Sequence, residues 1–357
     1  MLEKQHKAWF STQLLHWNEH QNDRIMPWKG IKDPYKIWLS EVILQQTRVE
    51  QGLDYYNRFI NAYPTVHELA QAPENEVFKY WEGLGYYSRC RNLIHTAKVV
   101  SNELQGQFPD SYAGLLSLKG VGPYTASAIG SFAFGLPTAV VDGNVIRVLA
   151  RFFGIEEAVD LNQVRSRIDD LAQQLIDQTN PAAYNQAIMD LGAMICKPQQ
   201  PACHDCPLAK KCIAQKKNLQ DVLPKKQPKK KVRNRWFYYL VVESGSSQLV
   251  RQRQGKDIWQ DLFEFILVET DEPADERLLK TSSFWGVSKE FFGKGPFLLS
   301  DEMVHLLSHQ KIHGRFLHIR VDKKFALDGF EWVGKKKRLS LAFPRLITRY
   351  LEMLEVN

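Results

Sequence analysis

The sequence has no uninterrupted apolar run approaching the ~20 residues that a membrane-spanning helix needs. Its first residues, 1–7, lack the apolar core and the small-residue cleavage site of a secretory signal. These absences predict a cytoplasmic protein with no membrane partner. Cysteine is also scarce, with five residues among 357. Because the cytoplasm is reducing, the few thiols are expected to bind metal or stay free rather than form disulfides.

Acidic residues are not in excess: 47 Lys and Arg face 40 Asp and Glu, a net charge of +7. Residues 1–224 contain 22 basic and 23 acidic residues, whereas residues 225–357 contain 25 and 17. The net charges are therefore −1 and +8. Residues 225–235 alone hold seven basic residues and no acidic one. This run is either a solvated linker or a non-specific contact to a polyanion such as DNA. Because residues 1–224 are nearly neutral, that part of the chain must bind a polyanion through local contacts rather than through its overall charge.

The chain divides into two regions of different composition. Apolar residues recur at helical spacing through residues 1–217, which predicts an all-α region. Residues 218–235, with two prolines and a lysine cluster, predict a basic linker. Residues 236–357 predict an α+β domain that ends in an amphipathic helix over 343–354. The expected strands of this domain are 236–242, 248–253, 262–268 and 315–321.

Four of the five cysteines are clustered in one short segment. They are Cys196, Cys203, Cys206 and Cys212. Only the middle pair has the close spacing typical of structural zinc sites, which usually show two such pairs. Four thiolates at uneven spacing favour an iron–sulfur cluster, in which each of four irons takes one sulfur, and zinc remains the alternative. Cys90 stands apart and is expected to be a small, buried apolar residue.

Residues 118–126 combine a Gly-x-Gly turn with the start of a helix. Gly120 and Gly122 permit backbone angles that other residues resist, and Pro123 suits the first helical turn. The amides of Gly120, Val121 and Gly122 can then face a phosphate at the helix N-terminus. The alternative is a plain turn between two helices.

Two carboxylates lie in contexts that suit acid–base chemistry. Asp142, directly before a Gly-Asn pair, is a good helix N-cap, which places it at an exposed helix end. Glu41 lies in the mostly apolar segment 38–44. Burial there would raise its pKa from about 4.3 towards neutrality, as a general acid requires. The alternatives are an exposed helix edge for Glu41 and a purely structural cap for Asp142.

These motifs together resemble one group of proteins. The cysteine spacing and residues 118–126 are similar to those of the endonuclease III-like helix–hairpin–helix DNA glycosylases. Within that superfamily, residues 38–47 resemble the adenine DNA glycosylases. The resemblance implies one 4Fe-4S cluster on the four cysteines. It also implies a six-helix barrel of about residues 29–137 containing the hairpin, and a cluster domain made of residues 1–28 and 138–217.

The resemblance further implies the reaction. Such enzymes hydrolyse the N-glycosidic bond of adenine mispaired with 8-oxoguanine or guanine in duplex DNA, during base excision repair. Glu41 would protonate the flipped adenine at N7, and Asp142 would stabilise the cationic sugar or bond to it covalently. Tyr124 and Asn144 would orient these groups. Other positions that match base or lesion contacts are Trp28, Lys29, Leu44, Gln46, Thr47, Leu84, Tyr86, Gln186, Ser308 and His309.

Some positions depart from the family pattern. Leu307 replaces the Phe of a Phe-Ser-His loop that senses 8-oxoguanine, Lys29 stands where some members have Arg, and Gln186 where some have Glu. Leu84 and Tyr86 suit a hydrophobic core equally well. The C-terminal domain, residues 236–357, resembles a Nudix-like domain but lacks the clustered glutamates of a hydrolytic Nudix motif. It is therefore expected to recognise the lesion rather than hydrolyse a nucleotide.

Two other functions compete with this interpretation. A bifunctional glycosylase and lyase of the endonuclease III type, acting on oxidised pyrimidines, would need a Schiff-base lysine two residues after the second hairpin glycine. Tyr124 stands there and cannot form an imine, and Lys119 lies before the hairpin. A non-enzymatic iron–sulfur DNA-binding protein would need neither Glu41 nor Asp142. The sequence thus predicts a monomeric, monofunctional enzyme whose partner is duplex DNA, and it leaves any protein partners unknown.

Overall fold

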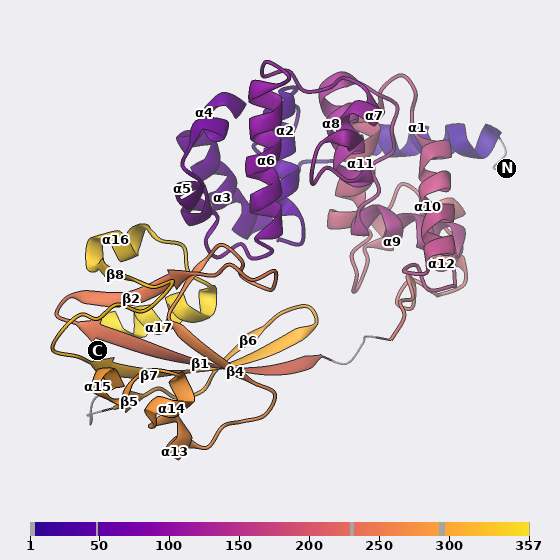
Figure 1. Cartoon of the computed structure of the whole chain (residues 1–357). Helices are drawn as coiled ribbons and strands as arrows, with labels where there is room; N and C mark the ends of the chain where they lie inside the picture. Colours follow the sequence, from indigo (N-terminus) through magenta and orange to yellow (C-terminus); the bar gives the residue numbers. More distant parts are fainter. Residues whose placement is uncertain (1–3, 48, 229–231, 293–296, 357) are drawn as a thin grey trace. The chain divides into compact units, whose positions relative to one another are not determined.

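The computed structural model describes residues 4–47, 49–228, 232–292 and 297–356 (Figure 1). The chain forms two compact units. Unit 1 contains residues 1–71 and 92–228, and unit 2 contains residues 72–91 and 229–357. Among the described residues, no helix combines the length and the apolar character that a membrane crossing requires.

Unit 1 is helical, which confirms the fold class predicted for residues 1–217. The helices that lie in it wholly or in part are α1 (Lys4–His20), α2 (Pro34–Leu44), α3 (Val49–Ala62), α4 (Val66–Gln71), α6 (Ser88–Asn102), α7 (Tyr112–Ser117), α8 (Pro123–Phe134), α9 (Gly143–Phe153), α10 (Asn162–Leu175), α11 (Pro181–Met194) and α12 (Ile213–Lys216). Two short 3-10 turns, η1 (Cys203–Asp205) and η2 (Ala209–Lys211), precede α12.

Helix α2 shows why an apolar helix carries a functional acid. Pro34 occupies its first turn, and the Asp33 side chain caps it by accepting hydrogen bonds from two backbone N–H groups. Every residue from Ile37 to Ile43 is buried, and Glu41 is among them with 7% of its surface exposed. The prediction of a largely buried helix is confirmed.

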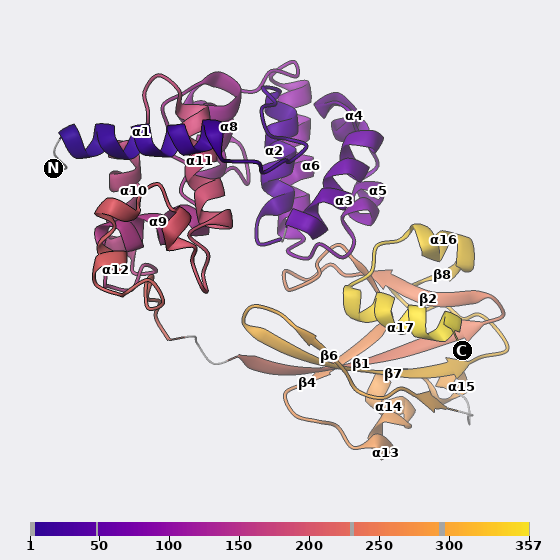
Figure 2. The same cartoon turned by 180° about the vertical axis from the view of Figure 1, so that it is seen from behind.

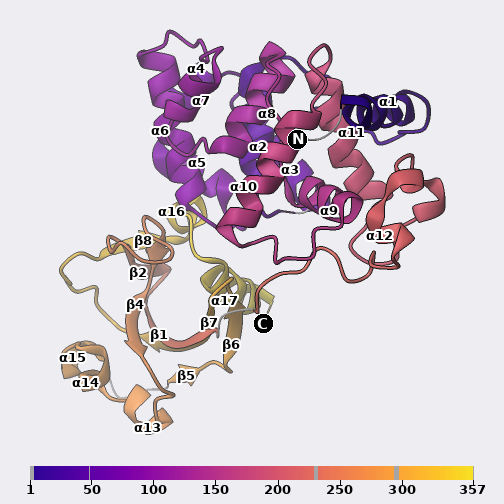
Figure 3. The same cartoon turned by 90° about the vertical axis from the view of Figure 1, so that its right-hand side faces the viewer.

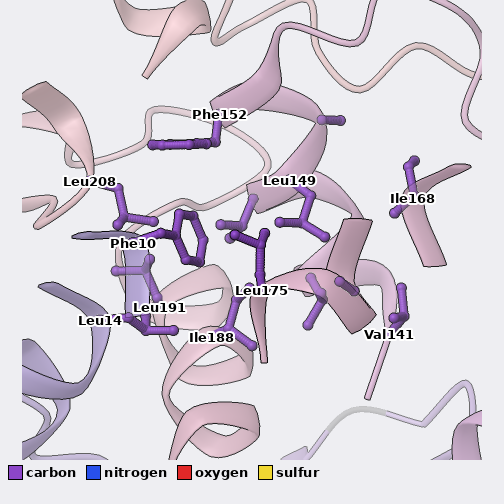
Figure 4. Packing of buried hydrophobic residues seen from close by; sticks show 14 of the residues in the cluster. Phe10, Leu14, Val141, Leu149, Phe152, Ile168, Leu175, Ile188, Leu191 and Leu208 are labelled. Atoms are coloured by element: carbon purple, nitrogen blue, oxygen red, sulfur yellow. The ribbon is translucent and has the colours of Figure 1, made fainter. Parts of the chain in front are cut away.

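A hydrophobic core holds α1 against α9, α10 and α11 (Figure 4). In Figure 2, α1 lies across α10 and α11. Phe10 of α1 meets Phe152 of α9 edge to face, with ring centroids 4.9 Å apart. Full burial of a large apolar side chain contributes about 1.5–3 kcal/mol, so this core is a main source of stability. Cys196, Cys206 and Cys212 pack against the same cluster, and the core therefore fixes the cysteine segment beside α9.

Unit 2 is built on a mixed sheet that has eight strands among the described residues. They are β1 (Arg233–Ser244), β2 (Ser247–Gln252), β3 (Phe263–Glu264), β4 (Ile266–Thr270), β5 (Leu298–Leu299), β6 (Met303–Leu306), β7 (Gln310–Arg320) and β8 (Glu331–Gly334). The order along the main path is β3-β2-β1-β7-β5, and β7 runs parallel to β1. The remaining pairings along this path are antiparallel, and three further antiparallel pairs join it: β4 with β1, β6 with β7 and β8 with β2.

Helices cover both faces of this sheet (Figure 3). They are α13 (Glu276–Leu279), α14 (Ser282–Trp285) and α15 (Lys289–Phe292) on one face, and α17 (Arg345–Val356) on the other; α5 (Glu74–Trp81) and α16 (Lys335–Ser340) complete the unit. Tyr238 and Leu240 of β1 pack towards Trp285 of α14. On the opposite face, Phe316 stacks on Tyr350 of α17 with ring centroids 3.9 Å apart. Because both faces are buried, β1 is apolar almost throughout rather than alternating.

The predicted strands at 236–242, 248–253 and 315–321 and the closing helix are confirmed with small shifts of their bounds. The predicted strand 262–268 is two strands, β3 and β4, separated at Phe265. In the predicted linker, the Lys225 carbonyl and the Gln227 amide hydrogen-bond with unit 1, and β1 already begins at Arg233. Residues 229–231 of the basic run lie outside the described residues.

Candidate active site

One cavity of about 470 Å³ lies wholly within unit 1. Its walls come from the loop before α2, from α2 itself, from residues of α8, α9 and α11, and from single residues of α1 and α3. Nine residues that the sequence singled out line it: Trp28, Lys29, Glu41, Leu44, Thr47, Tyr124, Asp142, Asn144 and Gln186. Cavities of this size commonly hold a small ligand or a single base.

Glu41 is one of two carboxyl groups in this cavity, and its pKa lies well above that of an ordinary glutamate. Burial raises its pKa to about 7. The hydrogen bond from the Tyr124 hydroxyl to Glu41 Oε2, 2.6 Å long, acts in the opposite direction, and the nearby charge of Asp142 raises the pKa further. A carboxyl group with this pKa is protonated in a large fraction of molecules near neutrality, so it can donate a proton.

Asp142 is the N-cap of α9, as predicted. Its Oδ1 accepts the Val145 backbone N–H at 2.7 Å, and its Oδ2 accepts the Asn144 side-chain amide at 2.7 Å. Burial raises the pKa of Asp142 from its ordinary value, while these hydrogen bonds lower it. Both carboxyl groups therefore have raised pKa values, but Asp142 accepts hydrogen bonds from two N–H donors, and these favour its charged form.

Arg147 was not singled out from the sequence, although it stands one helical turn after Asn144 on α9. It is buried, with 9% of its surface exposed. Its guanidinium donates to Asn144 Oδ1 at 2.8 Å, to the Gly192 carbonyl at 2.7 Å and to the Cys196 carbonyl at 2.7 Å. A Cβ on Gly192 would lie 2.6 Å from Cβ of Asn144, so only glycine allows α11 to approach this closely. Arg147 thus joins the Asn144–Asp142 pair to the cysteine segment.

Asp190 is a second residue missed in the sequence, and it organises the cationic wall of the cavity. Its side chain is fully buried on α11, one turn after Gln186. It accepts hydrogen bonds from Arg24 Nη1 at 2.8 Å and from Lys29 Nζ at 3.2 Å, and Lys29 also donates to the Arg24 carbonyl at 3.0 Å. The partners are about 160 positions apart along the chain. Lys29 is therefore an anchor of the loop as well as part of the wall.

The hairpin residues lie at the turn between α7 and α8. Gly120 has a φ of 81°, and a Cβ there would lie 2.6 Å from Cβ of Asn92, so this position needs glycine. Gly122 has an ordinary φ of −87° and is the N-cap of α8, with Pro123 in the first turn as predicted. No atom lies within 4 Å of where a Cβ on Gly122 would be. The special backbone angle expected of both glycines thus occurs only at Gly120, while Gly122 keeps the approach to the helix end open.

The four clustered cysteines line a second small cavity together with Arg151. No disulfide forms among the five cysteines, and Cys90 is buried as predicted. Arg151 donates to the Cys196 sulfur at 3.3 Å. Burial raises the pKa of Cys206 to about 12, so its thiolate requires a positive partner such as metal. Among the described residues, no group of three or more His, Cys, Asp or Glu side chains is arranged to hold a single metal ion.

The predicted lesion-contact residues outside the cavity lie mostly in unit 2. Ser308 and His309 are exposed in the turn between β6 and β7, where Leu307 N–H bonds the Gln310 carbonyl. Tyr86, with a φ of 47°, has 44% of its surface exposed, and its hydroxyl shares a hydrogen bond with Ser308 Oγ. Leu84 is buried. Gln46, in unit 1, has a φ of 59° and is absent from the cavity lining.

Comparison with known proteins matches both parts of the chain to families. Residues 39–174 match the HhH-GPD superfamily of base excision DNA repair proteins, and residues 237–353 match the NUDIX domain. The thermostable thymine-DNA glycosylase structure is 30% identical, with a TM-score of 0.55 over 61% of this chain and 100% of that one. A trapped endonuclease III–DNA intermediate, 23% identical, has a TM-score of 0.52 over 61% of this chain and 100% of that one, and shares the fold.

Curated relatives extend the match over the whole length. The human adenine DNA glycosylase is 43% identical over 223 residues, which cover 60% of this chain and 41% of that protein. The adenine DNA glycosylase of Buchnera aphidicola subsp. Schizaphis graminum is 30% identical over 354 residues, which cover 97% of this chain and 99% of that protein. The chain therefore belongs to the adenine DNA glycosylase family.

Proposed function

We propose that this protein is a monofunctional DNA glycosylase that hydrolyses the N-glycosidic bond of adenine paired with 8-oxoguanine or guanine in duplex DNA. One observation carries the proposal: Glu41 and Asp142 face the same cavity, Glu41 with a pKa raised to about 7 by burial and Asp142 held by two N–H donors. At the position of a lyase lysine, the Tyr124 hydroxyl instead donates to Glu41. This arrangement supports bond cleavage by acid catalysis without an imine.

Glu41 begins the reaction as a general acid. Its protonated carboxyl group donates a proton to adenine N7, and the C1′–N9 bond then breaks with its electron pair moving onto the base. Adenine leaves as a neutral molecule rather than as an anion. Tyr124 holds the carboxyl group through its hydrogen bond to Oε2, so the acid is oriented before the base arrives.

Asp142 balances the positive charge that develops on the sugar, either by electrostatic attraction or by a covalent bond to C1′. A water molecule then adds to C1′, and the Glu41 carboxylate accepts the proton that this water loses. The products are free adenine and an abasic site, and both acids return to their starting states. Asn144 keeps Asp142 in place by donating to Oδ2.

The cavity supplies the contacts for a flipped base. Trp28 and Leu44 offer apolar surface, and Lys29, Thr47 and Gln186 offer polar groups. The amides of Gly120, Val121 and Gly122 are proposed to bind a DNA phosphate, which carries no sequence information. The proposed contacts to the strand opposite adenine are Gln46, Leu84, Tyr86, Ser308 and His309.

We also propose that Cys196, Cys203, Cys206 and Cys212 hold one 4Fe-4S cluster. The four thiols line one cavity, and their uneven spacing in the sequence favours a multi-iron group over zinc. When bound, the cluster cross-links the segment and keeps its thiolates charged. Three of these residues, Cys196, Cys206 and Cys212, pack against the α1–α9–α11 core, and the segment carries Lys197, Lys210 and Lys211.

Replacing Cys206 with serine is expected to remove most of the bound iron and sulfide, because serine supplies a harder ligand than thiolate. Iron and acid-labile sulfide would be measured in the purified protein, together with its thermal unfolding. Wild type should contain both in equal amounts, and the buried but remote Cys90→Ser variant should match it. Zinc in place of iron in the wild-type protein would overturn the cluster assignment.

Replacing Arg147 with lysine is expected to slow adenine release by roughly 10–100-fold, since a single ammonium cannot replace the forked donors that orient Asn144. Binding of the mispair should change little. Single-turnover rates would be compared with those of Arg167→Lys, an exposed ion-paired arginine of the same unit. A double-mutant cycle with Asn144→Ala should be non-additive. Additive losses would show that Arg147 does not act through Asn144.

We propose that the chain is organised as a helical glycosylase region (residues 1–217), a basic linker (218–235) and a Nudix-like lesion-recognition domain (236–357). None of the five cysteines forms a disulfide, which agrees with a reducing compartment, and we place the protein in the cytoplasm as a monomer. Light scattering of the purified protein, with and without duplex DNA, tests the monomer assignment directly.

The decisive experiment is single-turnover cleavage of duplexes containing adenine opposite 8-oxoguanine, adenine opposite guanine, matched adenine–thymine, or an oxidised pyrimidine. Each product is resolved with and without alkali. Strand cleavage only after alkali, and only at mispaired adenine, supports a monofunctional adenine glycosylase. Cleavage without alkali at oxidised pyrimidines would instead establish the bifunctional endonuclease III type of reaction.

A further inference from the structure

The segment of residues 72–91 belongs to one region by sequence similarity and to the other by packing. It lies inside the region that matches the helix–hairpin–helix superfamily, residues 39–174. Its packing nevertheless places it in unit 2 with the C-terminal domain. Peptide bonds join it at both ends to unit 1, so the C-terminal domain holds a piece of the glycosylase chain.

The first point of attachment is a pair of charged residues at the end of α5. Glu82 Oε1 accepts the backbone N–H of Phe343 at 2.8 Å, and its Oε2 accepts Lys79 Nζ at 2.6 Å. Lys79 Nζ also donates to the Leu341 carbonyl at 3.2 Å. The pair thus binds one donor and one acceptor of the backbone on the two sides of residue 342.

The backbone of residues 341–343 is well suited to this role because it is itself fixed. The carbonyl of Ala342 accepts the Phe263 N–H at 2.8 Å, which joins the segment to β3. Phe343 is 2% exposed, and its ring lies 6.0 Å from that of Phe265. The Glu82 side chain is 18% exposed, and hydrogen bonds to a partly buried charge are stronger than neutral ones.

A second attachment lies at the other end of the segment. Arg91 Nη1 donates to the Gln260 carbonyl at 3.1 Å and to Asp261 Oδ2 at 3.3 Å. Tyr86 stands between the two attachments in the sequence, and its hydroxyl meets Ser308 Oγ. The segment is also braced internally, since Trp81 Nε1 donates to the Gly85 carbonyl at 3.0 Å.

We propose that Glu82, together with Lys79, is a positioning residue for recognition of the base opposite adenine. By binding the backbone of residues 341–343, the pair docks the segment 72–91 on the C-terminal domain and thereby sets Tyr86 against Ser308. This inference rests on the proposed function of the protein. It assigns a role to two residues that lie outside the catalytic cavity.

The first test measures single-turnover rates on adenine opposite 8-oxoguanine and opposite guanine. In Glu82→Ala the ratio of the two rates should fall roughly tenfold, because two charge-assisted hydrogen bonds are lost. Lys79→Ala should lower the ratio in the same direction. Glu82→Gln, which keeps an acceptor for the Phe343 N–H, should lower it less. Glu103→Ala, an exposed glutamate of unit 1, is the charge-matched control and should keep the wild-type ratio.

The second test is amide hydrogen exchange in the absence of DNA, followed by mass spectrometry. Peptides covering residues 341–346 should exchange faster in Glu82→Ala than in wild type, while peptides from β1 should not change. If exchange is faster but the ratio of rates is unchanged, or the ratio falls without faster exchange, the positioning role is wrong. If Glu82→Ala does not fold, Glu82→Gln and Lys79→Ala give the same comparison.

The two tests also separate this inference from the proposed function. A wild-type protein that releases no adenine overturns the proposed function and, with it, the role of Glu82 in lesion preference. In that case faster exchange at residues 341–346 would still identify the attachment itself. A wild-type protein with the expected preference, retained in all three variants, overturns only the role given to Glu82 and Lys79.

Discussion

Replacing Glu41 with glutamine is expected to slow adenine release by about 10³-fold, because the amide has the shape of the acid but no proton to donate. Binding of the mispaired duplex should be retained, since the side chain keeps its volume in the cavity. Single-turnover release and fluorescence anisotropy on the same duplex would separate the two effects. A variant that releases adenine at the wild-type rate would falsify the assignment of Glu41 as the acid.

The same residue predicts the pH dependence. Because burial raises the pKa of Glu41 to about 7, the rate should fall as pH rises above that value and the carboxyl group loses its proton. Removing the Tyr124 hydroxyl removes the hydrogen bond that lowers this pKa. Tyr124→Phe should therefore move the fall in the rate of adenine release to higher pH. Glu41→Gln should abolish this fall with pH.

Stability should respond to the same titration. A carboxyl group with a raised pKa stabilises the folded state below its unfolded value of 4.5, and this contribution is lost as pH rises through about 7. The loss is on the order of 3 kcal/mol. Glu41→Gln should consequently unfold at a higher temperature than wild type above neutrality and at a similar temperature in acid. Equal unfolding temperatures at both extremes would mean that Glu41 is not buried in its charged form.

Asp142→Asn is expected to lose adenine release by about 10³-fold or more, because the amide cannot balance the cationic sugar. The protein should remain folded, since asparagine caps a helix as well as aspartate does. The comparison variant is Asp160→Asn, which alters another aspartate of unit 1 that accepts a backbone N–H; neither Asp160 nor its partner Gln227 lines the cavity. That variant should lose stability and keep its rate. If Asp142→Asn instead loses stability and keeps the wild-type rate, Asp142 has only a structural role.

The sequence predicts those parts of the site that depend on local spacing. The burial of Glu41 follows from the apolar neighbours on its own helix, and the cap at Asp142 follows from the Gly-Asn pair after it. The turn at Gly120 and the cysteine spacing are local in the same sense. Each of these features involves residues within a few positions of one another, where helix geometry fixes the neighbours.

Other parts could not be predicted, because their partners are distant in the chain. Asp190 meets Arg24 and Lys29 across about 160 positions, and no spacing rule links them. Residues 72–91 belong to unit 2, where Glu82 meets the backbone of Phe343, 261 positions away in the chain. The short strands β5 and β8 form by pairing with longer neighbours rather than from any alternation of their own.

The cap at Asp142 has a genetic consequence. Because asparagine, serine and threonine all cap helices, substitutions at this position can remove chemistry without unfolding the chain. Such a protein would escape the proteases that clear unfolded chains and would accumulate at normal levels. It would occupy mispairs without repairing them, and it would exclude functional enzyme from the same sites. Alleles of this kind should behave as dominant, whereas alleles that disturb the core around Phe10 should be recessive.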